Sequence, residues 1–216
     1  MSQENKTTPS LLSAVLTGDI VNSTSLSALR SKELIRGMEE SFGSNPFEFY
    51  RGDAFQVYVA ETADALKIAL LCRCLAISVS GGNELPGDVR IGIGIGLVET
   101  PVGKLGTARG EAFLLSGRGF DGLADSGDRL IIAARGEWPS LALAILSDEI
   151  NGIFSALTAR QAEVLIEMLR GSTQREASLR LEKSQSTIHQ HLVAARWSQI
   201  EKCMRHYLGI VTLINQ

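Results

Sequence analysis

The sequence predicts an α+β fold in which a domain built on a β-sheet is followed by an all-α module. Three observations favour this fold. Short β-type runs alternate with helical runs over roughly the first 130 residues, and from Trp138-Pro139 the pattern is helical to near the end. In that helical part, two capping-box sequences, Thr158-x-x-Gln161 and Thr173-x-x-Glu176, mark the starts of closely spaced helices.

The elements of the first part follow the order β-α-β-β-α-β-α-β. Each is bounded by turn-forming residues such as Gly18-Asp19, Gly43 and the Arg51-Gly52 hairpin. This order is that of the split βαβ, or ferredoxin-like, arrangement. The predicted elements are the strand Ser13–Ile20, the helix Ser27–Phe42, the strands Phe47–Tyr50 and Asp53–Ala60, the helix Ala63–Val79, the strand Val89–Val98, the helix Glu111–Leu123 and the strand Arg129–Ala133.

The strand Val89–Val98 has the sequence VRIGIGIGLV, whose alternating glycines leave one face bare. Glycine inside a strand commonly marks the close approach of another backbone or of a ligand. The run lacks the GxGxxG spacing between a strand and a helix, so we expect no dinucleotide site here.

We expect four segments along the chain. Residues 1–12 are polar and are predicted to be disordered, and residues 13–136 form the sheet domain. Residues 137–156 hold a connecting helix, predicted over Leu141–Phe154, and residues 157–216 form the helical module.

Composition is that of an ordinary globular protein, with 44% apolar and 21% charged residues among 216. No apolar run reaches the roughly 18 residues that span a bilayer, and the polar start is unlike a secretion signal. Cys72, Cys74 and Cys203 are odd in number and lack metal-site spacing, which indicates buried, reduced thiols. We therefore expect a cytoplasmic protein without a membrane partner.

The helical module has the plan of a helix-turn-helix. A first helix presents Val164, Leu165, Met168 and Leu169 on one face and stops at Gly171. The second helix, Gln174–Leu181, is barely two turns long, and the third starts at Ser184. In DNA-binding proteins of this plan the last helix enters the major groove. Its predicted exposed side chains are those that hydrogen-bond base edges, namely Gln185, Ser186, His189 and Gln190.

Charge supports a DNA-binding role for this module. Residues 157–216 carry eight Lys/Arg and five Asp/Glu, a net +3, whereas residues 1–156 carry 13 against 19, a net −6. The cations expected to hold phosphates are Arg175, Arg180, Lys183 and Arg196. His189 and His191 point in different directions on a helix, so we expect no metal site between them.

The stretch LTARQAEVLIEMLRGSTQREASLRLEKSQSTIHQHL resembles the DNA-binding module of LuxR-type regulators and of the fourth region of sigma factors. The resemblance covers about 40 residues and implies a double-stranded DNA partner. The alternative is a helical scaffold or a protein-interaction module with no DNA target.

Three stretches of the first part resemble class III nucleotide cyclases. They are AVLTGDIVNST at 14–24, GDAFQVYV at 52–59, and VRIG followed by GEAFLLSGR within 89–118. The resemblance implies that Asp19 and Asp53 bind metal and that Arg118 stabilises a phosphate. Two metal ions about 4 Å apart would activate the attacking 3′-oxygen in such enzymes, and magnesium prefers carboxylate oxygens. It also implies a homodimer, because these cyclases build their sites between subunits.

Other positions depart from that family's pattern. Its asparagine before the arginine is Leu114, its base-reading lysine is Phe49, and the partner of that lysine is Leu105. Three outcomes stay open: nucleotide binding without turnover, no ligand at all, and real catalysis. Asp19 and Asp53 are also common turn-capping residues, and each has this local role as an alternative.

The phrase TGDIVNS, the domain that follows it and the C-terminal helix-turn-helix together resemble the SatD-like family of small bacterial proteins. We expect a DNA-binding transcription regulator whose degenerate cyclase-like domain senses a nucleotide with Mg2+. The alternative is an active nucleotidyl cyclase with a helical regulatory tail.

Overall fold

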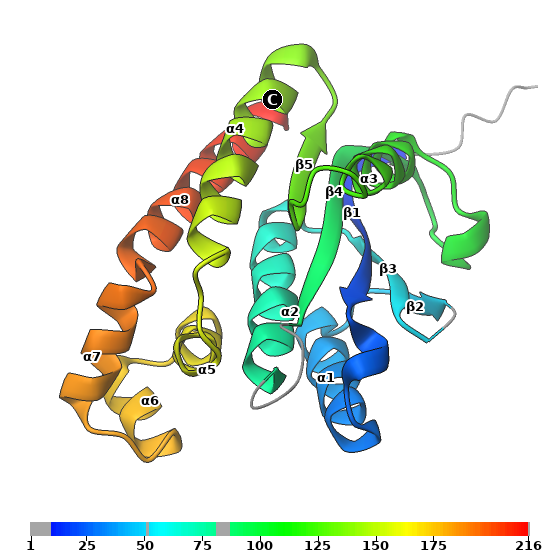
Figure 1. Cartoon of the computed structure of the whole chain (residues 1–216). Helices are drawn as coiled ribbons and strands as arrows, with labels where there is room; N and C mark the ends of the chain where they lie inside the picture. Colours follow the sequence, from blue (N-terminus) through cyan, green and yellow to red (C-terminus); the bar gives the residue numbers. More distant parts are fainter. Residues whose placement is uncertain (1–9, 51, 81–86, 216) are drawn as a thin grey trace, which may run out of the picture.

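The structure, a computed structural model, describes residues 10–50, 52–80 and 87–215. Its element order is the one predicted, and the fold is a mixed α+β arrangement with one five-stranded sheet (Figure 1). The strands are β1 (Ser10–Val21), β2 (Phe47–Tyr50), β3 (Ala54–Val59), β4 (Asp88–Glu99) and β5 (Leu130–Ala134). The α-helices are α1 (Ala28–Phe42), α2 (Ala65–Val79), α3 (Glu111–Gly122), α4 (Glu137–Phe154), α5 (Ala159–Leu169), α6 (Gln174–Arg180), α7 (Gln185–Ala194) and α8 (Trp197–Ile214).

The sheet has the strand order β2-β3-β1-β4-β5. Strands β2, β3, β1 and β4 pair antiparallel with their neighbours, and β5 joins β4 in parallel. The pairing of β1 with β4 is long and runs from Ser10 opposite Glu99 to Val21 opposite Asp88. Strand β1 is therefore central, and the residues at its end lie between β3 and β4.

The two faces of the sheet have different helices. On one face Ile91, Ile93 and Ile95 of β4 are fully buried in the same core as α1 and α2. On the other face the glycines between them lie under α3. Because side chains alternate along a strand, all three isoleucines point to one face of the sheet and the glycines lie on the other.

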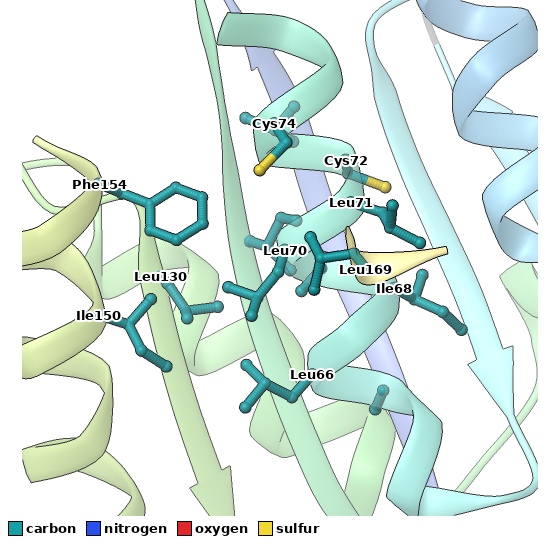
Figure 2. Close-up of a cluster of buried hydrophobic side chains, with 14 of the residues drawn as sticks. Leu66, Ile68, Leu70, Leu71, Cys72, Cys74, Leu130, Ile150, Phe154 and Leu169 are labelled. Atoms are coloured by element: carbon teal, nitrogen blue, oxygen red, sulfur yellow. The ribbon is translucent and has the colours of Figure 1, made fainter. Parts of the chain in front are cut away.

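Helix α2 lies at the centre of the molecule, and its apolar residues face in several directions. Figure 2 shows Leu66, Leu70 and Cys74 of α2 on the side toward Leu130 and Phe154, with Leu169 of α5 next to Leu70. One continuous cluster of buried side chains thus runs from β1 to α8. The division into residues 13–136, 137–156 and 157–216 stays a prediction, but packing joins these segments in one core.

Helix α8 also ties the C-terminal helices to the sheet region. The hydroxyl of the buried Tyr207 donates to the carbonyl of Thr62, at 2.6 Å, just before α2. Burial raises the pKa of Tyr207, so this donor stays protonated.

Three details differ from the sequence-based expectations. Residues 10–12, expected to be disordered, form the start of β1, because they pair with Leu97, Val98 and Glu99 of β4. Helix α4 begins at Glu137, one turn before the expected Leu141. Arg51 of the expected hairpin and residues 1–9 lie outside the described residues. Among the described residues, no helix is long and apolar enough to cross a bilayer.

Candidate functional site

Asp19 and Asp53 lie at the same end of two neighbouring strands. Asp19 is paired in register with Ala54, the residue after Asp53, across β1 and β3. The amide of Ile20 donates to the carbonyl of Asp53 at 3.1 Å, which extends this pairing by one step. The main chains of the two aspartates therefore lie side by side at this end of the sheet, as expected for antiparallel neighbours.

A third residue, Arg90 of β4, completes this end of the sheet. It lies directly opposite Asp19 in the β1–β4 register, and its Nε and Nη2 donate to the two carboxylate oxygens at 2.9 and 2.5 Å. The guanidinium carbon lies 5.7 Å from the ring centroid of Phe120 on α3. The hydrogen bond to Asp19 raises the pKa of Arg90. Arg90 was not identified from the sequence. Antiparallel pairing of TGDI with VRIG, which places Arg90 opposite Asp19, could have found it.

Asp53 also has a partner within the chain. The hydroxyl of Ser23, in the short 3-10 turn Ser23–Ser25, donates to its Oδ2 at 2.8 Å. Each carboxylate is thus held by a different element, and neither caps a helix.

In the structure Asp19 is paired with a cation of its own chain, whereas Asp53 has a neutral hydroxyl partner. Both oxygens of Asp19 already accept from Arg90, which supplies the positive charge that a metal would supply. Within residues 10–50, 52–80 and 87–215, no three His, Cys, Asp or Glu side chains gather where they would hold an ion.

Arg118 is not brought to this site within one chain. On α3, Ala112 and Ser116 are buried against the sheet, and Ser116 Oγ lies 3.0 Å from Thr17 Oγ1 of β1. Arg118 and Leu114, which is 62% exposed, lie on the opposite side of the helix. An Arg118 contact to Asp19 or Asp53 therefore requires a second copy of the chain.

Two of the apolar departures have structural roles. Phe49 belongs to an aromatic cluster with Phe42, Phe47 and Phe55, on the face of the sheet that packs on α1. Leu105 is 3% exposed and packs in a small cluster with Val15 on the α3 face.

On β2, the side chains adjacent to Phe49 point to the α3 face and form a polar pair. Tyr50 donates to Glu48 Oε2 at 2.6 Å, and the amide of Leu105 donates to Glu48 Oε1 at 2.9 Å. Burial, together with the Glu48 bond, raises the pKa of Tyr50 to about 12, whereas these hydrogen bonds lower the pKa of Glu48.

The alternating glycines of β4 are explained by backbone packing. A Cβ added at Gly94 would lie 2.2 Å from the carbonyl oxygen of Ala112 and 2.4 Å from the amide nitrogen of Ser116. A Cβ at Gly92 would lie 2.4 Å from the carbonyl oxygen of Ser116. Of the two expected causes, close approach of a backbone is the one present, since α3 lies directly on these residues.

The second candidate site lies on the C-terminal helices. Both predicted capping boxes are present, at Thr158 with Gln161 and at Thr173 with Glu176, and they start α5 and α6. Helix α7 starts after Ser184, whose side chain accepts from the amide of Thr187 at 3.1 Å. Its inner face is buried through Ile188 and Leu192. Its outer face is exposed and carries Gln185, Ser186, His189, Gln190 and the 64% exposed Val193.

The flanking cations fall into two groups. Lys183 pairs with Glu163 at 3.3 Å, Arg180 with Glu167 at 2.8 Å, and Arg196 with Glu149 of α4 at 3.1 Å. Arg175 is exposed and has no ion pair among the described residues. Of the four cations expected to bind phosphate, Arg175 is therefore the one that could do so without losing an ion pair within the protein.

Arg180 has a structural role in the module. Its Nη1 donates to Glu167 Oε2 and to Ser172 Oγ, each at 2.8 Å, and Ser172 donates to the same Glu167 oxygen at 2.9 Å. Glu167 and Ser172 are each only 8% exposed, so Arg180 compensates a buried carboxylate between α5 and α6.

Comparison with known proteins gives similarity at the level of structure alone. No family model and no curated protein matches the chain. Among solved structures, the guanylyl cyclase Cya2 has 16% identity and a TM-score of 0.41, with 58% of this chain and 76% of that chain covered. Two structures of a bacterial light-regulated adenylyl cyclase have 10% and 12% identity and TM-scores of 0.44 and 0.45, with 60% of this chain and 45% of theirs covered. At these identities no residue role is transferred to this chain.

Proposed function

We propose that the chain is a DNA-binding transcription regulator in which α5, α6 and α7 form a helix-turn-helix. The observation that carries the proposal is the outer face of α7, where Gln185, Ser186, His189 and Gln190 are exposed together. Amide, hydroxyl and imidazole groups are those that hydrogen-bond base edges in the major groove. In this proposal Arg175 holds a phosphate at the start of α6, and a homodimer presents two such modules to a two-fold operator.

In the same proposal, the sheet region is a degenerate cyclase-like domain that senses a nucleotide without converting it. The polar pairs Asp19–Arg90 and Asp53–Ser23 lie at one end of the sheet. In this proposal Arg90 shares its positive charge between Asp19 and a phosphate of the nucleotide. Any magnesium ion binds together with the nucleotide. The protein acts in the cytoplasm, where such a regulator meets DNA.

DNA binding is tested by incubating the purified full chain with a library of genomic fragments at low salt and sequencing the retained DNA. A shared sequence is expected. Gln190→Ala is expected to relax the preference at one base position by about 1 to 3 kcal/mol, because one base contact is lost. Lys32→Ala, an exposed lysine on α1, is the control and leaves the preference unchanged. Equal retention of all fragments, or of none, contradicts the proposal.

The second candidate function is an active nucleotidyl cyclase, favoured by the two aspartates at adjacent strand ends. We expect no cyclic product from ATP or GTP with magnesium or manganese, because Leu114 and Leu105 replace polar contacts. Loss of one preorganised contact costs a factor of roughly a hundred to a thousand in rate. Steady product formation that disappears in Asp53→Ala would support the enzyme instead.

A further inference from the structure

Helices α4 and α8 together present an exposed apolar face. Trp138 and Ile145 of α4 are 78% and 63% exposed, and Leu213 of α8 is 69% exposed. Large apolar side chains gathered on one face of a protein commonly mark a contact surface.

The two helices run antiparallel and have a groove between them. Arg196, at the start of α8, pairs with Glu149 near the end of α4, which fixes their relative direction. The groove has a volume of about 620 Å³, and Ala142 and Gly209 are the small residues on its two sides. A Cβ added at Gly209 would meet nothing within 4 Å, so the space above it is open. Small residues of this kind let another helix approach closely.

Each helix contributes one stripe of side chains with helical spacing to this face. The stripe on α4 is Trp138, Ala142, Ile145 and Glu149, and the stripe on α8 is Lys202, His206, Gly209 and Leu213. Because the helices are antiparallel, the apolar ends of both stripes lie together. The charged ends also lie together, with the acidic residue on α4 and the basic residue on α8.

We propose that this face binds a second copy of the chain, related by a two-fold axis parallel to α4 and α8. Such an axis places each α4 against the α8 of the other copy at the same height. Trp138 of one copy then meets Leu213 of the other, and Glu149 meets Lys202. Apolar ends then meet apolar ends and Glu149 meets Lys202, as an isologous interface requires, with Glu149 shared with Arg196 of its own chain.

The direction of the axis is fixed by two arguments. An axis perpendicular to the helices would place the charged end of each face on the apolar end of the other. It would also send the two α7 helices to opposite ends of the dimer. The parallel axis keeps both α7 helices at one end, since only Ala195 and Arg196 separate α7 from α8 (Figure 1). Two recognition helices on one side are what a two-fold DNA site needs.

The size of the face is adequate for a dimer. Helix α8 has 18 residues and is about 27 Å long, and two adjacent helices are about 20 Å wide. The projected area is therefore on the order of 500 Å² per copy, or 1,000 Å² in total, the lower bound for a specific interface. We expect a dissociation constant in the micromolar range rather than a permanent dimer.

The test is sedimentation of the full chain, without DNA, over a range of concentrations. A concentration-dependent dimer is expected, and Ile145→Glu is expected to weaken it at least about 100-fold, because a charge would enter the apolar contact. The matched control is Leu29→Glu on α1, since Leu29 is 68% exposed away from this face. Circular dichroism of both variants checks that they fold.

A second arm tests the axis. Glu149→Lys and Lys202→Glu are each expected to be monomeric, and an equimolar mixture of the two is expected to form a heterodimer, because opposite charges then meet across the interface. A monomeric wild type, a dimer unaffected by Ile145→Glu, or a mixture without heterodimer overturns the proposal. Only the argument about two α7 helices rests on the proposed function. Failure to bind DNA therefore leaves the sedimentation result standing, and a monomer that binds DNA refutes the dimer face alone.

Discussion

The end of the sheet around Asp19 and the outer face of α7 are both rich in polar side chains, but those side chains are used differently. At the sheet, Asp19 is held by Arg90 and Asp53 by Ser23. On α7, Gln190 and His189 are exposed on a helix whose other face is buried. The end of the sheet holds two carboxylates, but each is hydrogen-bonded within the chain, and Asp19 is paired with an arginine. On α7 the polar side chains are open to solvent.

This difference shows that residue type alone is weak evidence for a working site. A carboxylate paired with an arginine has lost much of its capacity to attract a metal, because the pair is already neutral. An exposed row of hydrogen-bonding groups costs the protein nothing and gains contacts only on binding.

The largest expected effect concerns the glycines of β4, which at the sheet serve close packing against α3 rather than the binding of a ligand. Gly94→Ala is expected to destabilise the fold by at least about 3 kcal/mol, because the new methyl group would overlap main-chain atoms of α3. Gly117→Ala, on the open side of α3, has no atom within 4 Å of its Cβ and should gain up to about 1 kcal/mol from helix propensity. Urea unfolding measures both. Equal stability of the two variants would show that α3 does not lie on this strand.

A smaller effect is expected at the ion pair. Asp19 and Arg90 side chains are 21% and 29% exposed, so Asp19→Asn should cost about 1 to 2 kcal/mol, between the values for surface and buried pairs. Millimolar magnesium should leave the free energy of unfolding of the wild type unchanged. In Arg90→Met, which frees the carboxylate, magnesium should become stabilising. If magnesium stabilises the wild type and this effect is lost in Asp19→Asn, the sheet site binds a metal ion and the account of the ion pair is wrong.

The smallest effect is the pH dependence of α6, the helix that supports the α7 face. The backbone and side-chain hydrogen bonds from Thr173 lower the pKa of Glu176 from its ordinary value of 4.5. A carboxyl with a lowered folded pKa stabilises the protein above its unfolded pKa, and this contribution is lost as pH falls through the folded pKa. Glu176→Gln should therefore flatten the loss of stability below pH 4.5 in thermal unfolding, relative to Glu182→Gln, an exposed neighbour. If the acid profile of Glu176→Gln is unchanged, the capping box does not cause the loss of stability at low pH.

Much of the fold could be predicted because its signals are local. Ser27, Thr158, Thr173 and Ser184 each accept from a main-chain amide at the start of a helix, as their positions indicated. The β-type runs and the turn residues that bound them predicted the sheet elements to within a few residues. Such features depend on neighbours in sequence, which a single chain displays directly.

The partners of the site residues could not be predicted in the same way. Arg90 is 71 residues from Asp19, and Glu167 is 13 from Arg180, so these pairs depend on register and on helix packing. The sequence alone gave equal weight to Arg175, Arg180, Lys183 and Arg196 as phosphate contacts. Only the packing of α4 and α5 distinguishes the paired cations from Arg175.

That distinction gives the most direct test of the account, the salt dependence of DNA affinity measured by fluorescence anisotropy. The logarithm of the binding constant should fall linearly with the logarithm of salt concentration, as counterions are released. Arg175→Ala should reduce this slope by about one, because one phosphate contact is lost. Arg180→Ala should leave the slope unchanged and lower the stability of the module, because Glu167 loses its partner. A slope that responds to Arg180 and not to Arg175, or an affinity that does not depend on salt, would contradict the account.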